Sequence, residues 1–454
     1  MKGGEVMRRI FALFLLTGTI LAGVAAGAAE LEKLLDKRGE IWNTTVADVA
    51  KLFPRTFSWM DESQSRCRFN IVTSRPAKLT LYGKELQEVL LDFKNGKIDQ
   101  ISISVYNRGD AGQMDQRKFN DLLDLFEKKL SDYAATGGAP RKENPIIAGA
   151  KVSTLIWEGE TFDVMLLWSS SGRKIPEYLK LELAKSGAAS LRLRDRFKTD
   201  VGSEELAGNV RNDPNGDRYI LLPMVDQGAK GYCVAATVER IVKYYGSEID
   251  QHQIAQIAES DADRGTSILK ILEALDRGAN KLGIRCESYY QYEEMNTVSD
   301  VRKVVREYNN IARRQKKPKI DLDDYTITLD KVRYLNLGKL MSSMDIEVFR
   351  AIRQKDRGDY QKFLNQIREN IDAGIPVCWC TFVLPSQKQT SGGATDFGMH
   401  MRIINGYNTR TGDIIFTDSW GKGHEKKIVN AEDAWAITFT TLGVLPRNRR
   451  AVRK

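Results

Sequence analysis

The clearest periodic pattern in the chain follows Cys233. Five apolar residues there recur at the three- and four-residue spacing that places side chains on one face of a helix. They are Val234, Val238, Ile241, Val242 and Tyr245. Gly246 comes next, and glycine commonly ends a helix because it adopts the left-handed conformation without strain. The pattern predicts an amphipathic helix that begins at Cys233.

Apolar runs near the C-terminal end predict a hairpin. Residues 399–407 and 414–421 read as strands, and the polar residues 408–412 between them read as a turn. A hairpin of this kind brings the His400 imidazole and the Asp418 carboxylate side by side. This is the arrangement that a catalytic base needs from the residue that orients it.

The N-terminal half has its own pattern. Two apolar runs, 89–93 and 98–106, flank Asn95-Gly96, the dipeptide that favours a type I′ hairpin turn. The elements that follow are a helix with one apolar face at 119–133 and strands at 152–157 and 161–168. We expect a small α+β domain of β-β-α-β-β order over residues 29–184. A linker rich in charge, Gly and Ser is expected at 185–217.

Two side chains near the start of the Cys233 helix can carry chemistry. A cysteine at a helix N-terminus lies where the macrodipole and free N–H groups favour the nucleophilic thiolate. Gln227 lies six residues earlier, where its side-chain amide can donate to an oxyanion beside the sulfur. The alternative is a buried structural cysteine before an ordinary helix. Cys233, Gln227, His400 and Asp418 are the candidate catalytic residues.

These residues carry a resemblance to a known family. Gln-Gly-x-x-Gly-x-Cys, then His before Gly-Tyr, then Asp-Ser-Trp-Gly resembles the papain-like cysteine peptidases in order and spacing. The likeness is closer to their bacterial, bacteriocin-processing-type branch. The segments that carry this closer likeness are Cys233-Val-Ala-Ala236, Gly265-Thr266-Ser267 and Gly374-Ile-Pro376-Val377.

The resemblance implies a papain-like catalytic domain, α+β in class, over residues 218–454. In such a domain a helix carrying the nucleophile packs on an antiparallel sheet. Residues 296–364 look mostly helical and lengthen the interval from Cys to His, so we interpret them as an insertion. The sequence departs from the family at Val234, where an aromatic residue is usual, and at Asp418, where Asn is usual. Asp396 and Asn405 compete with Asp418 for the role of orienting the imidazole.

The N-terminal 28 residues predict a signal peptide. Basic residues precede the apolar run 10–24, and Ala26-Gly27-Ala28 is typical of a cleavage site. A retained single-span anchor is the alternative. We expect export through the Sec pathway to the periplasm or beyond, with no stable membrane insertion after the leader is removed. The oligomeric state cannot be read from the sequence.

Composition limits the classes of partner. The 454 residues are 42% hydrophobic and 28% charged, as in a globular protein, and the formal net charge is +9. Its basic clusters, at 313–319 and 447–454, come with no recognisable nucleic-acid-binding motif, so no nucleic-acid partner is expected. His252 and His424 stand in polar contexts and read as surface residues.

The cysteines and histidines are too few for a metal site. Five cysteines and three histidines leave no cluster with zinc-ligand spacing, so neither a metal nor a cofactor is expected. Cys378 and Cys380 fall on a buried strand predicted at 377–383 and point to one face. An odd number of cysteines leaves at least one thiol unpaired within the chain, and Cys233 is the candidate.

The predicted function is hydrolysis of peptide bonds in a protein or peptide substrate. One alternative is a cysteine acyltransferase or cell-wall amidase with the same triad, and another is a catalytically silent binding protein of papain-like shape. The N-terminal unit reads as a recognition or scaffold domain, with an inhibitory prosegment as the alternative.

Overall fold

The structure is a computed structural model with a mixed α+β fold and several antiparallel sheets. It describes residues 28–71, 73–134, 138–147, 150–171, 174–188, 201–228, 232–257, 283–295, 297–329, 332–382 and 399–447. Three expectations lie outside these residues: the leader up to residue 27, the helix start at Gly265-Thr266-Ser267, and Asp396. Among the described residues, no helix is both long and apolar enough to span a bilayer.

The N-terminal sheet has nine strands and is larger than the predicted β-β-α-β-β unit. Its order is β2-β3-β6-β7-β12-β11-β10-β8, and β9 pairs with β10. The strands are β2 (Ser58–Trp59), β3 (Arg66–Asn70), β6 (Glu88–Lys94), β7 (Lys97–Asn107), β8 (Arg141–Glu143), β9 (Ile146–Ile147), β10 (Ala150–Trp157), β11 (Phe162–Ser170) and β12 (Pro176–Lys185). The unpredicted strand β12 lies between β7 and β11, so it joins the two predicted hairpins into one sheet.

Local chemistry explains the first of these hairpins. Asn95 and Gly96 between β6 and β7 have φ of 54° and 74°, and a type I′ turn requires positive φ at both positions. The turn is the one predicted.

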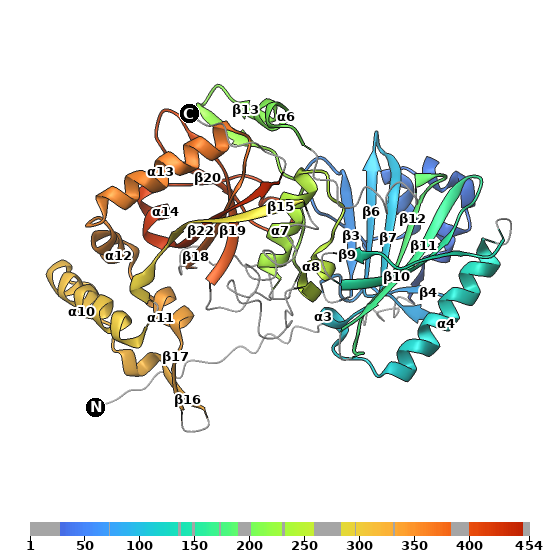
Figure 1. The fold of residues 1–454 in the computed structure, drawn as a ribbon, viewed down its shortest axis with the longest axis horizontal. Helices are drawn as coiled ribbons and strands as arrows, with labels where there is room; N and C mark the ends of the chain where they lie inside the picture. Colours follow the sequence, from blue (N-terminus) through green and yellow to red (C-terminus); the bar gives the residue numbers. More distant parts are fainter. Residues whose placement is uncertain are drawn as a thin grey trace, which may run out of the picture.

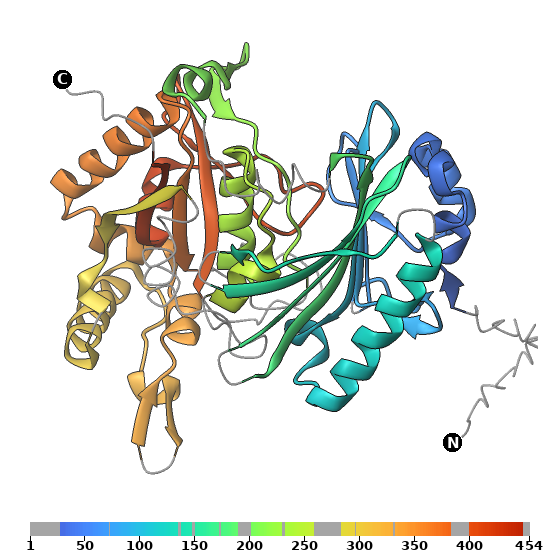
Figure 2. The same cartoon turned by 45° about the vertical axis from the view of Figure 1, so that its right-hand side comes forward.

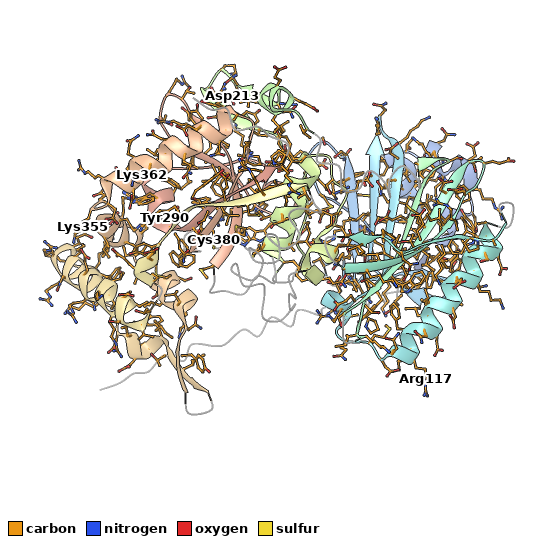
Figure 3. The ribbon with its side chains drawn as sticks, viewed as in Figure 1. Arg117, Asp213, Tyr290, Lys355, Lys362 and Cys380 are labelled. Carbon is orange, nitrogen blue, oxygen red and sulfur yellow. The ribbon has the colours of Figure 1, made fainter. Side chains whose placement is uncertain are left out.

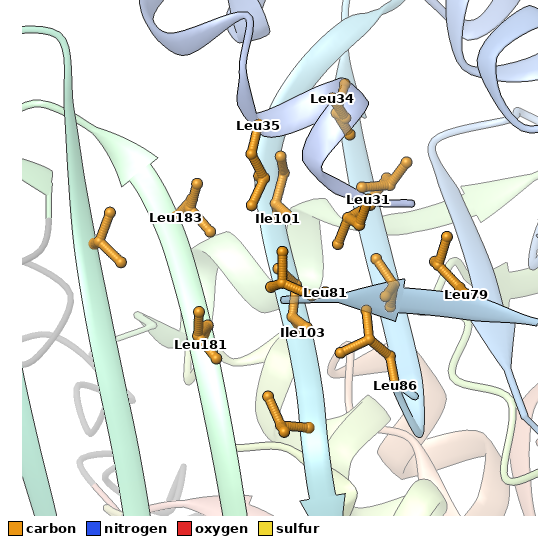
Figure 4. Close-up of a cluster of buried hydrophobic side chains, with 14 of the residues drawn as sticks. Leu31, Leu34, Leu35, Leu79, Leu81, Leu86, Ile101, Ile103, Leu181 and Leu183 are labelled. Atoms are coloured by element: carbon orange, nitrogen blue, oxygen red, sulfur yellow. The ribbon is translucent and has the colours of Figure 1, made fainter. Parts of the chain in front are cut away.

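One face of the N-terminal sheet is covered by helices. They include α1 (Glu32–Leu35), α2 (Val46–Leu52) and α4 (Gln116–Tyr133), and α4 buries Phe119, Phe126 and Leu130. Figure 4 shows Leu34 and Leu35 beside Ile101 of β7, within the apolar cluster of this face. A small sheet of β1 (Ala29–Glu30), β4 (Leu79–Leu81) and β5 (Lys84–Glu85) adds leucines to the same cluster.

The C-terminal sheet has eight strands in the order β13-β14-β19-β18-β22-β15, with β20 on β19 and β21 on β20. The strands are β13 (Val210–Asn212), β14 (Asp217–Ile220), β15 (Ile284–Gln291), β18 (Val377–Phe382), β19 (Met399–Asn408), β20 (Ile414–Thr417), β21 (Lys427–Val429) and β22 (Thr438–Pro446). The predicted hairpin is formed by β19 and β20. The expected linker is partly structured, because α6 (Ser203–Gly208) and β13 lie within it and β13 belongs to this sheet.

Helices cover both faces of the C-terminal sheet. Helices α13 (Arg357–Asp372) and α14 (Ala431–Ile437) share an apolar cluster with Val377 and Trp379 of β18. Helix α7 (Cys233–Tyr244) shares a different cluster with Cys378 and Cys380 of the same strand. Because side chains alternate along a strand, α7 packs on the face opposite to α13 and α14.

The segment 296–364 is mostly helical, as predicted. Its helices are α10 (Val298–Gln315), α11 (Leu337–Ser343), α12 (Ile346–Arg353) and the first part of α13. An unpredicted hairpin of β16 (Thr326–Leu329) and β17 (Val332–Leu335) lies between α10 and α11.

The two large sheets meet through helices α7 and α8 (Gln251–Ile257). Both views of the fold show these helices between the N-terminal and C-terminal sheets (Figures 1 and 2). The apolar cluster around α7 includes residues from both sheets; those from the N-terminal sheet are Val152, Ile156, Met165, Leu167 and Tyr178. One continuous core therefore links the N-terminal sheet to the helix that begins at Cys233.

Candidate active site

Cys233 is the first residue of helix α7, as the apolar spacing predicted. The preceding residue, Tyr232, makes no side-chain hydrogen bond that caps the helix. The N-terminal N–H groups and the helix dipole therefore act on the partly buried sulfur, which favours its ionised form.

His400 lies near the start of β19, and its imidazole contacts both other members of the predicted triad. Its Nε2 lies 3.1 Å from Oδ1 of Asp418. A hydrogen bond also joins the ring to the Cys233 sulfur, for which Nδ1 is the remaining ring nitrogen. The fold thus brings Cys233 next to His400, more than 160 positions away in the sequence, and His400 in turn contacts Asp418.

Cys233 and His400 shift each other's pKa toward the charged forms. Burial alone would raise the pKa of the Cys233 thiol, but the hydrogen bond and charge of His400, with backbone N–H groups of Met401 and Val234, lower it below its ordinary value. Burial alone would lower the pKa of His400, but its hydrogen bonds with Asp418 and Cys233 raise it. Both shifts favour a thiolate beside an imidazolium.

Asp418 is fully buried and surrounded by positive charge. Arg402 Nε lies 3.0 Å from Oδ1, and Lys427 Nζ lies 3.2 Å from Oδ2, with His424 Nδ1 at 3.8 Å. Burial would raise the pKa of this carboxyl, but the charge of Arg402, followed by the hydrogen bond from His400, lowers it well below its ordinary value. Asp418 therefore stays ionised and accepts from His400.

A buried arginine of α7 fixes the backbone that carries Asp418. Arg240 donates from one terminal nitrogen to the Asp418 carbonyl at 2.8 Å and from the other to Thr417 Oγ1 at 2.7 Å. Its Nε donates to the carbonyl of Pro223 at 2.9 Å. Burial lowers the pKa of Arg240 to about 10, with the charge of Asp418 opposing the shift. The guanidinium ties the helix of the nucleophile to the loop of the carboxylate.

No role was predicted from the sequence for Arg402 or Arg240, and only Arg402 left a signal. Arg402 is two residues after His400, and side chains at that spacing share one face of a strand. Arg240 lies outside the apolar stripe of α7, so the helical spacing gave no sign that it is buried.

Gln227 is buried, and Ser419 holds it from two sides. The Gln227 backbone N–H donates to the Ser419 carbonyl at 2.9 Å, and Ser419 Oγ donates to Gln227 Oε1 at 2.8 Å. With Oε1 engaged as an acceptor, the NH₂ group is the part of the side chain that can donate to an oxyanion. Ser419 belongs to the Asp-Ser-Trp-Gly motif, but its contact with Gln227 was not predicted.

Trp420 covers the histidine. Its ring stacks on the His400 ring with centroids 4.5 Å apart and an angle of 20° between the planes. The indole therefore limits access of water to that face of the imidazole and keeps the ring in one orientation. Asn405, the competing candidate, instead donates to the Ile220 carbonyl at 2.9 Å.

The expectation that His252 and His424 are surface residues is wrong. The His252 side chain is 9% exposed and its Nε2 lies 3.0 Å from Glu88 Oε2. The His424 side chain is 12% exposed and approaches Asp418. Glu88 is 164 positions from His252 in the sequence, so the polar local context of that histidine gave no sign of it, whereas Asp418 lies only six residues before His424.

Three of the other cysteines, Cys67, Cys378 and Cys380, are unsuited to nucleophilic chemistry. None of the five forms a disulfide. Burial raises the pKa of Cys67, Cys378 and Cys380, whereas the pKa of Cys233 is lowered. Figure 3 marks Cys380 within the C-terminal sheet, away from the rim where Lys355 and Lys362 are labelled. The predicted strand around it is β18, and Cys378 and Cys380 do share one face.

The fold and the site thus define an α+β protein with a buried Cys-His-Asp cluster and a Gln beside it. The comparison with known families agrees with this class. Residues 336–441 match the model of the Peptidase_C39 like family, a bacteriocin-processing-type papain-like peptidase family. This match includes His400 and Asp418, whereas Gln227 and Cys233 lie before it and reach the site through the fold. A search of the curated proteins finds no match.

Proposed function

We propose that the protein is a cysteine endopeptidase in which Cys233, His400 and Asp418 form the catalytic triad and Gln227 completes the oxyanion site. The observation that supports it most directly is the single cluster made by these residues, with the pKa of the thiol lowered and that of the imidazole raised. The family match supports a peptide as substrate.

The reaction begins with attack of the Cys233 thiolate on the carbonyl carbon of a peptide bond. A C–S bond forms and the carbonyl π electrons move to the oxygen. The backbone N–H of Cys233 and the Gln227 amide donate to this oxyanion, each contributing about 3 kcal/mol by comparison with other oxyanion sites. Collapse of the intermediate breaks the C–N bond, and the His400 imidazolium gives its proton to the departing amine.

Deacylation returns the enzyme to its starting state. Neutral His400 takes a proton from water as the oxygen attacks the thioester carbon. The C–S bond then breaks, releasing a carboxylic acid and restoring the thiolate–imidazolium pair. Asp418 keeps the imidazole in one tautomer through Nε2, and Trp420 keeps the ring in plane.

We also propose an architecture and a location for this activity. The catalytic unit is papain-like, with α7 as the helix of the nucleophile packed on the antiparallel C-terminal sheet. The basic and apolar composition of residues 1–28 supports export before activity. N-terminal sequencing of the protein recovered outside the inner membrane tests export, since a cleaved leader leaves Ala29 as the first residue.

The decisive experiment compares Cys233→Ala with the matched variant Cys286→Ala. Cys286 lies on β15, outside the proposed machinery. Hydrolysis of casein and of a peptide library should vanish in Cys233→Ala and persist in Cys286→Ala, with unchanged thermal unfolding in both. Hydrolysis that survives in Cys233→Ala overturns the proposal. Release of peptidoglycan fragments, or transfer to added amines, with casein intact favours an amidase or acyltransferase. No turnover in the wild type, with the fold intact, favours a silent binding protein.

A further inference from the structure

The loop that carries Gln227 contacts the N-terminal region, by which we mean the described residues from 28 to 188. Three anchors hold this loop. Ser419 binds Gln227 as described above, and Gln251 of α8 donates from Nε2 to the Asp226 carbonyl at 3.2 Å. The third anchor is Arg68 of β3, which belongs to the N-terminal sheet. The loop beside the nucleophile is thus partly built by a region outside the matched family domain.

Arg68 is itself held rigidly. It is 2% exposed, and its Nε donates to Glu88 Oε1 at 2.6 Å. Glu88 lies on the neighbouring strand β6 at a diagonal position, since Asn70 and not Arg68 is its direct partner. The other Glu88 oxygen faces His252 of α8 at 3.0 Å. The pair Arg68–Glu88 therefore joins the N-terminal sheet to the helix next to α7.

The Arg68 guanidinium reaches the loop at two points. One terminal nitrogen lies 3.4 Å from Asp226 Oδ2, and Oδ1 of the same carboxylate accepts from the Gly228 backbone N–H at 2.8 Å. Gly228 has φ +71°, and a Cβ atom at this position would lie 3.2 Å from the other terminal nitrogen of Arg68. Gln227 therefore lies between Asp226, which pairs with the buried guanidinium, and Gly228, whose lack of a side chain leaves room for it.

A second contact with the N-terminal region is made by Tyr232, next to the nucleophile in the sequence. Tyr232 directly precedes Cys233 and is 4% exposed. Its hydroxyl packs so closely on Gly109 of α3 (Arg108–Ala111) that a Cβ atom there would lie 1.9 Å away. Both Gln227 and Cys233 are therefore adjacent to residues that the N-terminal region holds in place.

We propose that the N-terminal region is a permanent part of the active site and that Arg68 is a positioning residue for the Gln227 amide. This inference rests on the proposed function. A prosegment that leaves on maturation is incompatible with it, because the N-terminal sheet shares one hydrophobic core with α7 and because departure would remove Arg68 from the loop. Arg68 acts through Asp226 and Gly228, without touching substrate.

The test separates the oxyanion site from the nucleophile. Asp226→Asn keeps an acceptor for the Gly228 N–H but loses the ion pair with Arg68, and it leaves Arg68–Glu88 intact. Because a displacement of about 1 Å costs up to 10²-fold in rate, kcat for peptide hydrolysis should fall about 10-fold or more. Alkylation of Cys233 by iodoacetamide needs no oxyanion site, so its rate should stay within about twofold of wild type. Folded Arg68→Met should likewise show a lower kcat with an unchanged rate of Cys233 alkylation.

Glu85→Gln is the matched control, since it removes an exposed ion pair with Lys78 in the same region. Its kcat and alkylation rate should both equal those of wild type. Wild-type kcat in folded Asp226→Asn overturns the inference, and so does an equal fall in kcat and alkylation rate, which indicates a general structural role. A wild-type enzyme that alkylates at Cys233 but hydrolyses nothing refutes the proposed function instead.

Two further measurements bear on permanence. In Gly109→Ala the added methyl group would clash with the Tyr232 hydroxyl and displace the residue before Cys233, so kcat should fall, although alanine usually stabilises a helix. An unchanged kcat contradicts a role for this contact. Intact-mass analysis of the species alkylated at Cys233 should show a chain that retains the N-terminal region. The proposal is overturned if the active species has a mass that shows the loss of all residues up to about 200.

Discussion

Arg402 Nε lies 3.0 Å from Asp418 Oδ1, the same oxygen that faces the His400 imidazole at 3.1 Å. Both side chains are at most 2% exposed, so neither charge is shared with water. The guanidinium and the imidazole therefore share one carboxylate oxygen, and the charge of Arg402 keeps Asp418 ionised, so that it can only accept from His400.

The first prediction concerns this pair and stability. Asp418→Asn leaves Arg402 buried without its counter-charge, and breaking a buried pair by removing one partner costs about 3–5 kcal/mol. The double variant Asp418→Asn/Arg402→Met should recover much of that loss. Urea unfolding of the two single variants, the double variant and wild type gives the coupling energy. Additive losses would show that the two residues act independently.

The second prediction concerns the dependence of kcat/KM on pH. The active form has a thiolate and an imidazolium, so it is lost on the acid side when the pair gains a proton and on the alkaline side when it loses one. Because the pKa of Cys233 is lowered from 9.0 and that of His400 is raised from 6.5, a bell-shaped profile should have its acid limb below 9.0 and its alkaline limb above 6.5.

Asp418→Asn should move one limb of that profile. The hydrogen bond with Asp418 helps to raise the pKa of His400, so its weakening shifts the alkaline limb to lower pH. Peptide hydrolysis measured from acid to alkaline pH in both proteins checks the shift. An alkaline limb at the wild-type position would mean that Asp418 does not support the imidazolium.

The third prediction is selective alkylation. At neutral pH a sub-stoichiometric amount of iodoacetamide should modify Cys233 first, since the thiolate is the nucleophile and burial raises the pKa of Cys67, Cys378 and Cys380. Peptide mapping by mass spectrometry locates the adduct. Preferential modification of Cys286, which is only half-buried, would contradict the activation of Cys233.

The fourth prediction ranks Gln227 and Ser419. Gln227→Ala removes one oxyanion donor and should lower kcat about 10²- to 10³-fold. Ser419→Ala removes the hydrogen bond that orients the Gln227 amide, so kcat should fall less, about 10-fold, with a smaller change in KM. The double variant should be no slower than Gln227→Ala. A double variant slower by the product of both effects would mean that Ser419 has a separate role.

Local sequence determined the elements that depend on neighbours in the chain. The apolar spacing after Cys233 was sufficient to predict α7, and Asn95-Gly96 was sufficient to predict the β6–β7 turn, because propensity and periodicity act over a few residues. The motifs around Gln227, His400 and Asp418 identified the residues that the fold brings together. Strand β12 was missed although its apolar and polar residues alternate in part, and only its place between β7 and β11 reveals its importance.

The tertiary structure decided which charges meet. The neighbours of His252 in the sequence are polar, yet its side chain is nearly buried and pairs with Glu88, 164 positions away. The pairing of Arg68 with the Asp226 loop likewise joins residues more than 150 positions apart. Such partners are chosen when apolar surfaces of the two sheets close on α7, because a buried charge must then find its opposite within the space that packing leaves.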